Sequence, residues 1–98
     1  MPRYLTVGTL KTKPGHRPAA EQIADQGAPG MAQQPGFERV VFFLDEARNE
    51  YGAVSFWKSR ETAEQANTVL TPMFEQAFGD LLEGSLTTAV YEIYEHKT

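Results

Sequence analysis

Cysteine is absent from this sequence, which excludes a disulfide framework, a thiolate metal site and a cysteine nucleophile. Histidine is scarce, and His16 and His96 lie far apart without the spacing of metal ligands. We therefore expect no metal site, and only these two side chains are candidates for a general base near neutral pH. Because no Gly-rich loop fits a phosphate or dinucleotide fingerprint, we also expect no cofactor.

Basic residues are nearly missing from the second part of the chain. Residues 61–98 hold one Lys or Arg against seven Asp or Glu, and the whole chain has a net charge of −4. This balance argues against nucleic acid as a partner. Long apolar runs are missing too, including at the start of the chain, so we expect no signal peptide, no membrane span and a cytoplasmic location.

A chain of 98 residues is long enough for one domain, which we predict to span residues 1–98. Strands are predicted by residues that alternate between apolar and polar, and helices by apolar residues at helical spacing. The order predicted is strand 3–11, helix 17–26, strand 37–45, strand 51–58, helix 60–70, short helix 71–82 and strand 86–95. Gly27–Gly30 should break or kink the first helix, Thr71-Pro72 should begin a new one, and Gly84 should end it.

This β-α-β-β-α-β order is the ferredoxin-like α+β arrangement, with a four-stranded antiparallel sheet. In such a fold the helices cover one face of the sheet, yet residues 40–44 are apolar on both faces. An uncovered apolar face is unusual for a monomer, so we predict a homodimer in which two sheets stack face to face into an α/β barrel. The alternative is a monomer whose exposed face is less apolar than the pattern indicates.

The strand at 51–58 predicts a small-molecule pocket. Ala53, Ser55 and Trp57 alternate with Val54 and Phe56, and we assign the first set to the helix side and the second to the dimer interface. Small residues leave room for a ligand under the helices. The predicted pocket residues are Thr6, Gly8, Ser55, Trp57, Phe74 and Phe78. The alternative is that Trp57 and the two phenylalanines are ordinary core.

A few polar and aromatic residues have two interpretations each. His16 follows a Lys-Pro-Gly turn at the start of the first helix and is a candidate catalytic base, or else an exposed loop residue without a role. Arg39 interrupts an apolar strand, either at a sheet edge, or with its stem buried, or as an anchor for an anionic ligand. Tyr51, Tyr91 and Tyr94 suit strands in any case, and a role in proton transfer is the less favoured interpretation.

Residues 55–63, Ser-Phe-Trp-Lys-Ser-Arg-Glu-Thr-Ala, carry a resemblance to a known family. They are similar to the strand-to-helix junction x-x-W-x-S-x-E-x-A of the antibiotic-biosynthesis-monooxygenase family, in the dimeric α/β-barrel superfamily. The order of elements over nearly the whole chain fits this family as well. The resemblance implies a substrate between sheet and helices, oxidised by O₂ without a cofactor. Trp57 would then position the substrate, with His16 as the candidate base.

The monooxygenase function has two alternatives. The first is a non-catalytic dimeric barrel, either a ligand-binding or a stress-related module. The second is haem degradation, because that branch of the superfamily also has the tryptophan. Its pattern further needs an asparagine in the first strand and a histidine in the last helix, and those positions align with Gly8 and Phe78 here, neither of which can hold iron. Haem degradation is thus disfavoured, and we expect a monooxygenase that acts on an aromatic or polyketide-like molecule, with the non-catalytic module as the alternative.

Overall fold

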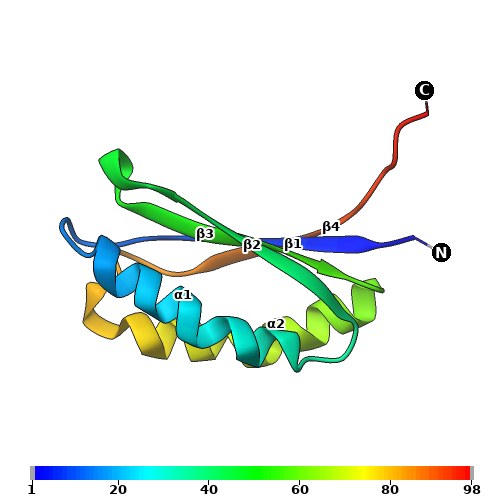
Figure 1. Cartoon of the computed structure of the whole chain (residues 1–98), viewed down its shortest axis with the longest axis horizontal. Coiled ribbons are helices and arrows are strands. Elements are labelled where there is room, and N and C mark those ends of the chain that lie inside the picture. The colour runs from blue at the N-terminus through cyan, green and yellow to red at the C-terminus, as the bar shows by residue number, and fades with distance from the viewer. Residues whose placement is uncertain (1, 98) are drawn as a thin grey trace.

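The computed structural model describes residues 2–97 and shows a four-stranded antiparallel sheet with both helices on one face (Figure 1). The sheet order is β2-β3-β1-β4, so the predicted β-α-β-β-α-β ferredoxin-like fold is confirmed. The strands are β1 (Tyr4–Lys11), β2 (Phe37–Asp45), β3 (Glu50–Trp57) and β4 (Thr87–Glu92), the helices are α1 (Arg17–Ala32) and α2 (Arg60–Phe78), and two 3₁₀ turns are η1 (Glu46–Arg48) and η2 (Gly79–Leu81). Neither helix within residues 2–97 is long and apolar enough to cross a membrane.

The helix-facing side of the sheet is where the core lies. Thr6 of β1 pairs with Ser55 of β3, and both side chains are buried. One core cluster is centred on Trp57 and the other on Leu10. Because strand side chains alternate, the residues between these positions face away from the helices. Val54 and Phe56 are among them, as the alternation predicts.

A β-bulge in β2 sets which side chain meets Trp57. The register shifts between Phe37 and Arg39, so that Phe37 pairs with Trp57 while Arg39 pairs with Phe56. The extra residue moves Phe37 to the helix side, where its ring meets the indole edge to face at 5.6 Å. Arg39 stays on the open face of an edge strand, with its guanidinium 4.8 Å from the centre of the Phe56 ring.

Both helices continue through a proline, so Gly27–Gly30 does not break α1, and the prediction that a new helix begins at Thr71-Pro72 is wrong. Proline removes one backbone hydrogen bond and leaves a carbonyl four residues earlier without its partner. Those carbonyls belong to Asp25 and Thr68, which are exposed, so water can satisfy them. Burial of apolar residues beyond each proline holds the helix together.

Met31 provides that burial in α1 and Phe78 in α2, since these side chains are 4% and 6% exposed. The second helix then ends at Gly79, whose φ of 52° belongs to the left-handed region. The prediction that Gly84 ends this helix is therefore wrong. Gly84 also has a positive φ, but it lies in the loop that leads to β4.

The sheet face opposite the helices carries rows of apolar side chains. Val41, Val54 and Val7 form one row across three adjacent strands, according to the register of the pairs. Val41 is 45% exposed, and Phe43 on the same strand is 39% exposed. Within residues 2–97 no helix covers this face (Figure 1).

Candidate functional site

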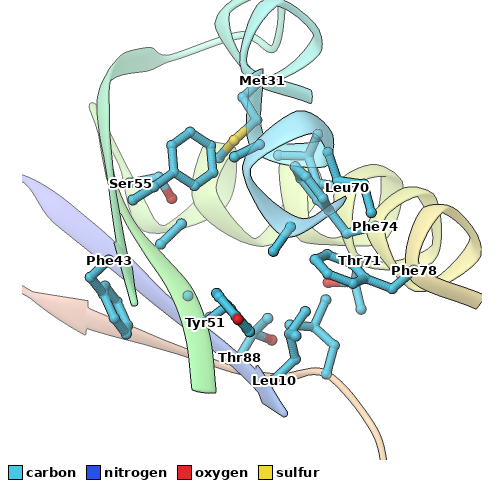
Figure 2. Close-up of a pocket in the computed structure, with 18 of the residues that line it drawn as sticks. Leu10, Met31, Phe43, Tyr51, Ser55, Leu70, Thr71, Phe74, Phe78 and Thr88 are labelled. Carbon is cyan, nitrogen blue, oxygen red and sulfur yellow. The ribbon is translucent and has the colours of Figure 1, made fainter. Parts of the chain in front are cut away.

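A cavity of about 240 Å³ lies between the sheet and the two helices. Figure 2 shows Phe78 of α2 on the side of Leu10 and Tyr51, and Leu70 of the same helix closer to Met31. The residues that line the cavity are Thr6, Gly8, Leu10, Ala20, Glu21, Ile23, Ala24, Met31, Phe42, Phe43, Leu44, Tyr51, Gly52, Ala53, Ser55, Asn67, Leu70, Thr71, Phe74, Phe78, Leu86 and Thr88. Most of them are apolar, as in sites that bind small organic molecules.

The floor of the cavity is built from small residues at the centre of the sheet. Gly8 and Ala53 pair directly across β1 and β3, and Thr6 pairs with Ser55 one step further along the same face. Larger side chains at these positions would fill the space below the helices. The predicted floor of Thr6, Gly8 and Ser55 is thus found around one cavity, with Phe74 and Phe78 on its helix side.

Trp57 lies beside this cavity and is not among the described residues that line it. Its side chain is 1% exposed and packs in the cluster that contains Met31 and Leu70, which do line the cavity. The indole Nε1–H donates a hydrogen bond of 2.9 Å to the hydroxyl of Ser55. Trp57 is therefore linked to the cavity by its hydrogen bond to the lining residue Ser55. Its predicted role in positioning a substrate stays a prediction.

The junction after Trp57 is held by a capping box at the start of α2. The Ser59 hydroxyl accepts a hydrogen bond of 3.1 Å from the backbone N–H of Thr62, and the Thr62 hydroxyl accepts one of 3.3 Å from the N–H of Ser59. Two free donors of the first turn are satisfied in this way. This junction fixes where the helix starts and hence where Leu70 and Phe74 meet the sheet.

His16 is the N-cap residue of α1, and it is not among the described residues that line the cavity. Its carbonyl accepts a hydrogen bond of 3.0 Å from the backbone N–H of Ala20, and Ala20 does line the cavity. The His16 backbone thus lies one helical turn before Ala20 along α1. A catalytic role for His16 stays a prediction.

Ion pairs connect the first turn of α1 with the turn between β2 and β3. Arg17 contacts Glu21 at 3.0 Å and Glu46 at 3.3 Å. The hydrogen bond from Arg17 to Glu21, and then that to Glu46, raise the pKa of the Arg17 guanidinium above its ordinary value. All three groups are exposed, so the pairs contribute little to stability. Of the three residues, Glu21 is the one that lines the cavity.

Several lining residues were missed by the sequence reasoning. Glu21 is the only charged side chain among the described lining residues, and Asn67, Thr71 and Thr88 add polar groups. They lie on helices and on an edge strand, where polar residues normally face solvent and give no signal in a sequence. Tyr51 is 6% exposed and also lines the cavity, although only its preference for a strand could be predicted.

A metal centre is not supported by the described part of the chain. Within residues 2–97, no group of three His, Cys, Asp or Glu side chains is arranged to hold a metal ion.

A second and smaller cavity of about 200 Å³ lies between α1 and α2. Phe74 lines both cavities, so this ring is a partition between them.

Similarity to solved structures extends over nearly the whole chain. A protein provisionally named an antibiotic biosynthesis monooxygenase from Bordetella bronchiseptica has a TM-score of 0.77 at 15% identity, covering 100% of this chain and 99% of its own. Rv0793 from Mycobacterium tuberculosis has a TM-score of 0.76 at 12% identity, covering 98% and 99%. A Caulobacter crescentus protein with the same provisional name as the first has a TM-score of 0.74 at 18% identity, covering 96% and 92%. At these identities the likeness shows the fold alone.

Family membership rests on sequence. Among curated proteins, none matches the chain significantly. The profile of the family described as antibiotic biosynthesis monooxygenase matches residues 3–69, which is more than half of the chain. That region runs from β1 to the middle of α2, and it contains Trp57, Ser59 and much of the cavity floor. The chain therefore belongs to the antibiotic biosynthesis monooxygenase family.

Proposed function

We propose that this protein is a monooxygenase that oxidises an aromatic or polyketide-like small molecule with O₂ and without a cofactor. The observation that carries the proposal is the cavity of about 240 Å³ between sheet and helices, lined mainly by apolar side chains. An apolar cavity of about 150 Å³ holds benzene, so a cavity larger than that suits a fused-ring molecule.

The proposed reaction needs few chemical groups from the protein. A base removes a proton from an activated CH₂ group of the substrate, and the resulting carbanion supplies electrons to O₂. One oxygen atom ends in a new carbonyl group and the other leaves as water, so that one O₂ is consumed for each CH₂ oxidised. The protein contributes binding, exclusion of water and orientation.

Two side chains are candidates for the base. His16 is the candidate that the sequence predicts, and it would have to act from the N-cap of α1. Glu21 is the second candidate, because it is a lining residue and its carboxylate is held by Arg17 at 3.0 Å. In both cases Trp57 acts as a positioning residue through Ser55.

The second candidate function is a ligand-binding module without catalysis. It is favoured by the composition of the lining, in which Glu21 is the only charged group among the described residues. Such a module would bind the same apolar or aromatic molecules. The two functions differ only in whether O₂ is consumed.

We further propose that the protein is a homodimer formed by the open faces of two sheets. The row of apolar side chains on that face supports this, with Val41 more than a third exposed in the single chain. A face-to-face dimer would remove them from water.

The test combines binding with oxygen uptake. Purified protein is titrated with hydroquinones, polycyclic phenols and haem while Trp57 emission and dissolved O₂ are recorded in one cuvette. Saturable quenching with O₂ consumption is expected for a monooxygenase, and quenching without consumption supports the binding module. Ala53→Leu places bulk in the cavity and should abolish both signals, whereas Ala32→Leu on the exposed end of α1 should abolish neither. Signals that are identical in both variants would contradict the proposal.

A further inference from the structure

The Thr6 hydroxyl is a buried polar group that no side chain or backbone atom satisfies. Thr6 is 5% exposed, its Oγ1 has no hydrogen-bond partner among the residues that the structure describes, and it lines the cavity. Leaving such a group unpaired is costly, and unpaired buried groups in native proteins usually have a reason. A reason that fits its place is a ligand atom in the cavity.

Ser55 is the direct neighbour of Thr6 across β1 and β3, on the same face of the sheet. Its Oγ accepts a hydrogen bond of 2.9 Å from the indole N–H of Trp57. A hydroxyl has one proton to donate and two lone pairs, so this bond leaves the Ser55 proton free. The bond with Trp57 is the one that the structure gives to the Ser55 side chain within residues 2–97.

Thr6 and Ser55 are therefore paired residues on the floor of an apolar cavity, and each has a hydroxyl proton that no described residue accepts. We propose that Thr6 and Ser55 form a paired donor site for one acceptor oxygen of the ligand, such as the carbonyl of an aryl ketone. Trp57 is the positioning residue, because its N–H occupies a lone pair of Ser55 and leaves the proton for the ligand. This inference rests on the proposed function, since it names the class of molecule that the same cavity takes.

The charge of the lining further restricts the ligand. Among the described lining residues there is no Lys, Arg or His, and the one charged group is the carboxylate of Glu21. An anionic ligand would lose its hydration without a cation in the lining to replace it, because Arg17 is not among the described lining residues and is already paired with Glu21 and Glu46. The ligand class is thus a neutral fused-ring molecule with an acceptor oxygen, and not a carboxylate or a phosphate.

The experiment compares two probes that differ by one oxygen. Tetralin and 1-tetralone share a fused-ring frame, and only the second has a carbonyl. Binding of each to the full chain is measured by calorimetry, and the preference is the ratio of the two dissociation constants. Thr6→Val, which removes the hydroxyl and keeps the shape, should lower the preference about tenfold, the usual worth of one hydrogen bond. Binding of tetralin should change less than about twofold, which also verifies that the variant is folded.

Two further variants separate the hydroxyl from packing. Thr6→Ser keeps a hydroxyl and should restore most of the preference that Thr6→Val loses. Trp57→Phe removes the N–H behind Ser55 and should lower the preference without an equal loss of tetralin binding. Because Trp57 is the only tryptophan, the protein has one indole N–H resonance. That resonance should shift more with 1-tetralone than with tetralin.

The outcomes distinguish this inference from the function on which it rests. If neither probe binds the unaltered protein, the proposed small-molecule cavity fails and the inference fails with it. If both probes bind and Thr6→Val leaves the preference unchanged, the cavity stands and the donor pair is overturned. A third probe, tetralin-1-carboxylate, should bind more weakly than tetralin, and tighter binding would overturn the assignment to neutral ligands.

Discussion

At the scale of single residues, Trp57 joins the core to the cavity. It is 1% exposed, its ring contacts Phe37, and its N–H donates a hydrogen bond to Ser55. A side chain in this position has two effects when it is changed. Its volume supports the packing of α2 on the sheet, and its N–H orients a group that faces the ligand. Activity and stability are therefore expected to fall together when Trp57 is replaced.

Trp57→Phe is expected to lower the free energy of unfolding by about 1–3 kcal/mol, because part of a buried ring and one buried hydrogen bond are lost. Urea unfolding followed by circular dichroism measures this, since the only tryptophan is removed. Tyr94→Ala is the control, because that aromatic side chain is 77% exposed and its loss should cost less than about 0.5 kcal/mol. A cost for Trp57→Phe as small as that of the control would contradict the core role.

The sequence predicts which side of the sheet each strand residue faces, but not which neighbours a large side chain contacts. Alternation along β1 and β3 assigned Thr6, Gly8 and Ser55 to the helix side, and all three line the cavity. The period of two is a property of every strand, so this part is reliable. The contact of Phe37 with the Trp57 indole depends on the bulge before Arg39, and no local pattern in the sequence indicates that bulge.

At the scale of elements, the contact between α1 and α2 depends on a glycine. Gly27 is buried, and a Cβ atom at this position would lie 2.5 Å from Cζ of Phe74. The helices can approach each other here only because Gly27 has no side chain. Phe74 lines both cavities, so this contact also sets the shape of the ligand site.

Two glycines of α1 should therefore respond in opposite ways to the same substitution. Gly to Ala inside a helix normally stabilises by about 1 kcal/mol. Gly30→Ala should follow this rule, because its Cβ would meet the Met73 sulfur at an ordinary 3.8 Å. Gly27→Ala should instead destabilise by about 1–3 kcal/mol, since Phe74 has to move. Urea unfolding of both variants measures the difference, and a gain in stability for Gly27→Ala would contradict the proposed contact.

The same helices show where local rules fail. The rules for proline and glycine predict helix breaks at Pro29 and Pro72, and both helices continue. The cost of one lost hydrogen bond at an exposed carbonyl is smaller than the gain from burying Met31 or Phe78 in the next turn. That gain comes from contacts between elements, so only the folded structure reveals it.

At the scale of the whole molecule, both faces of the sheet are apolar, but only one of them is covered by helices. The helices cover one face, and the other carries Val41, Val54 and Val7 in a row. The sequence predicts this imbalance because residues 40–44 lack alternation. A cavity on the covered side and an open apolar face behind it place the ligand site close to the proposed dimer interface.

Val41→Glu is expected to separate the proposed dimer. Val41 is 45% exposed in the single chain, so the charge costs little there, but in a face-to-face dimer it would be buried without a partner. Sedimentation equilibrium should give twice the chain mass of 10.9 kDa for the unaltered protein and the mass of one chain for the variant. Val69→Glu is the matched control, because Val69 is 51% exposed on α2, away from this face, and its variant should remain a dimer. A single-chain mass for the unaltered protein would show that the apolar face is not covered by a second copy.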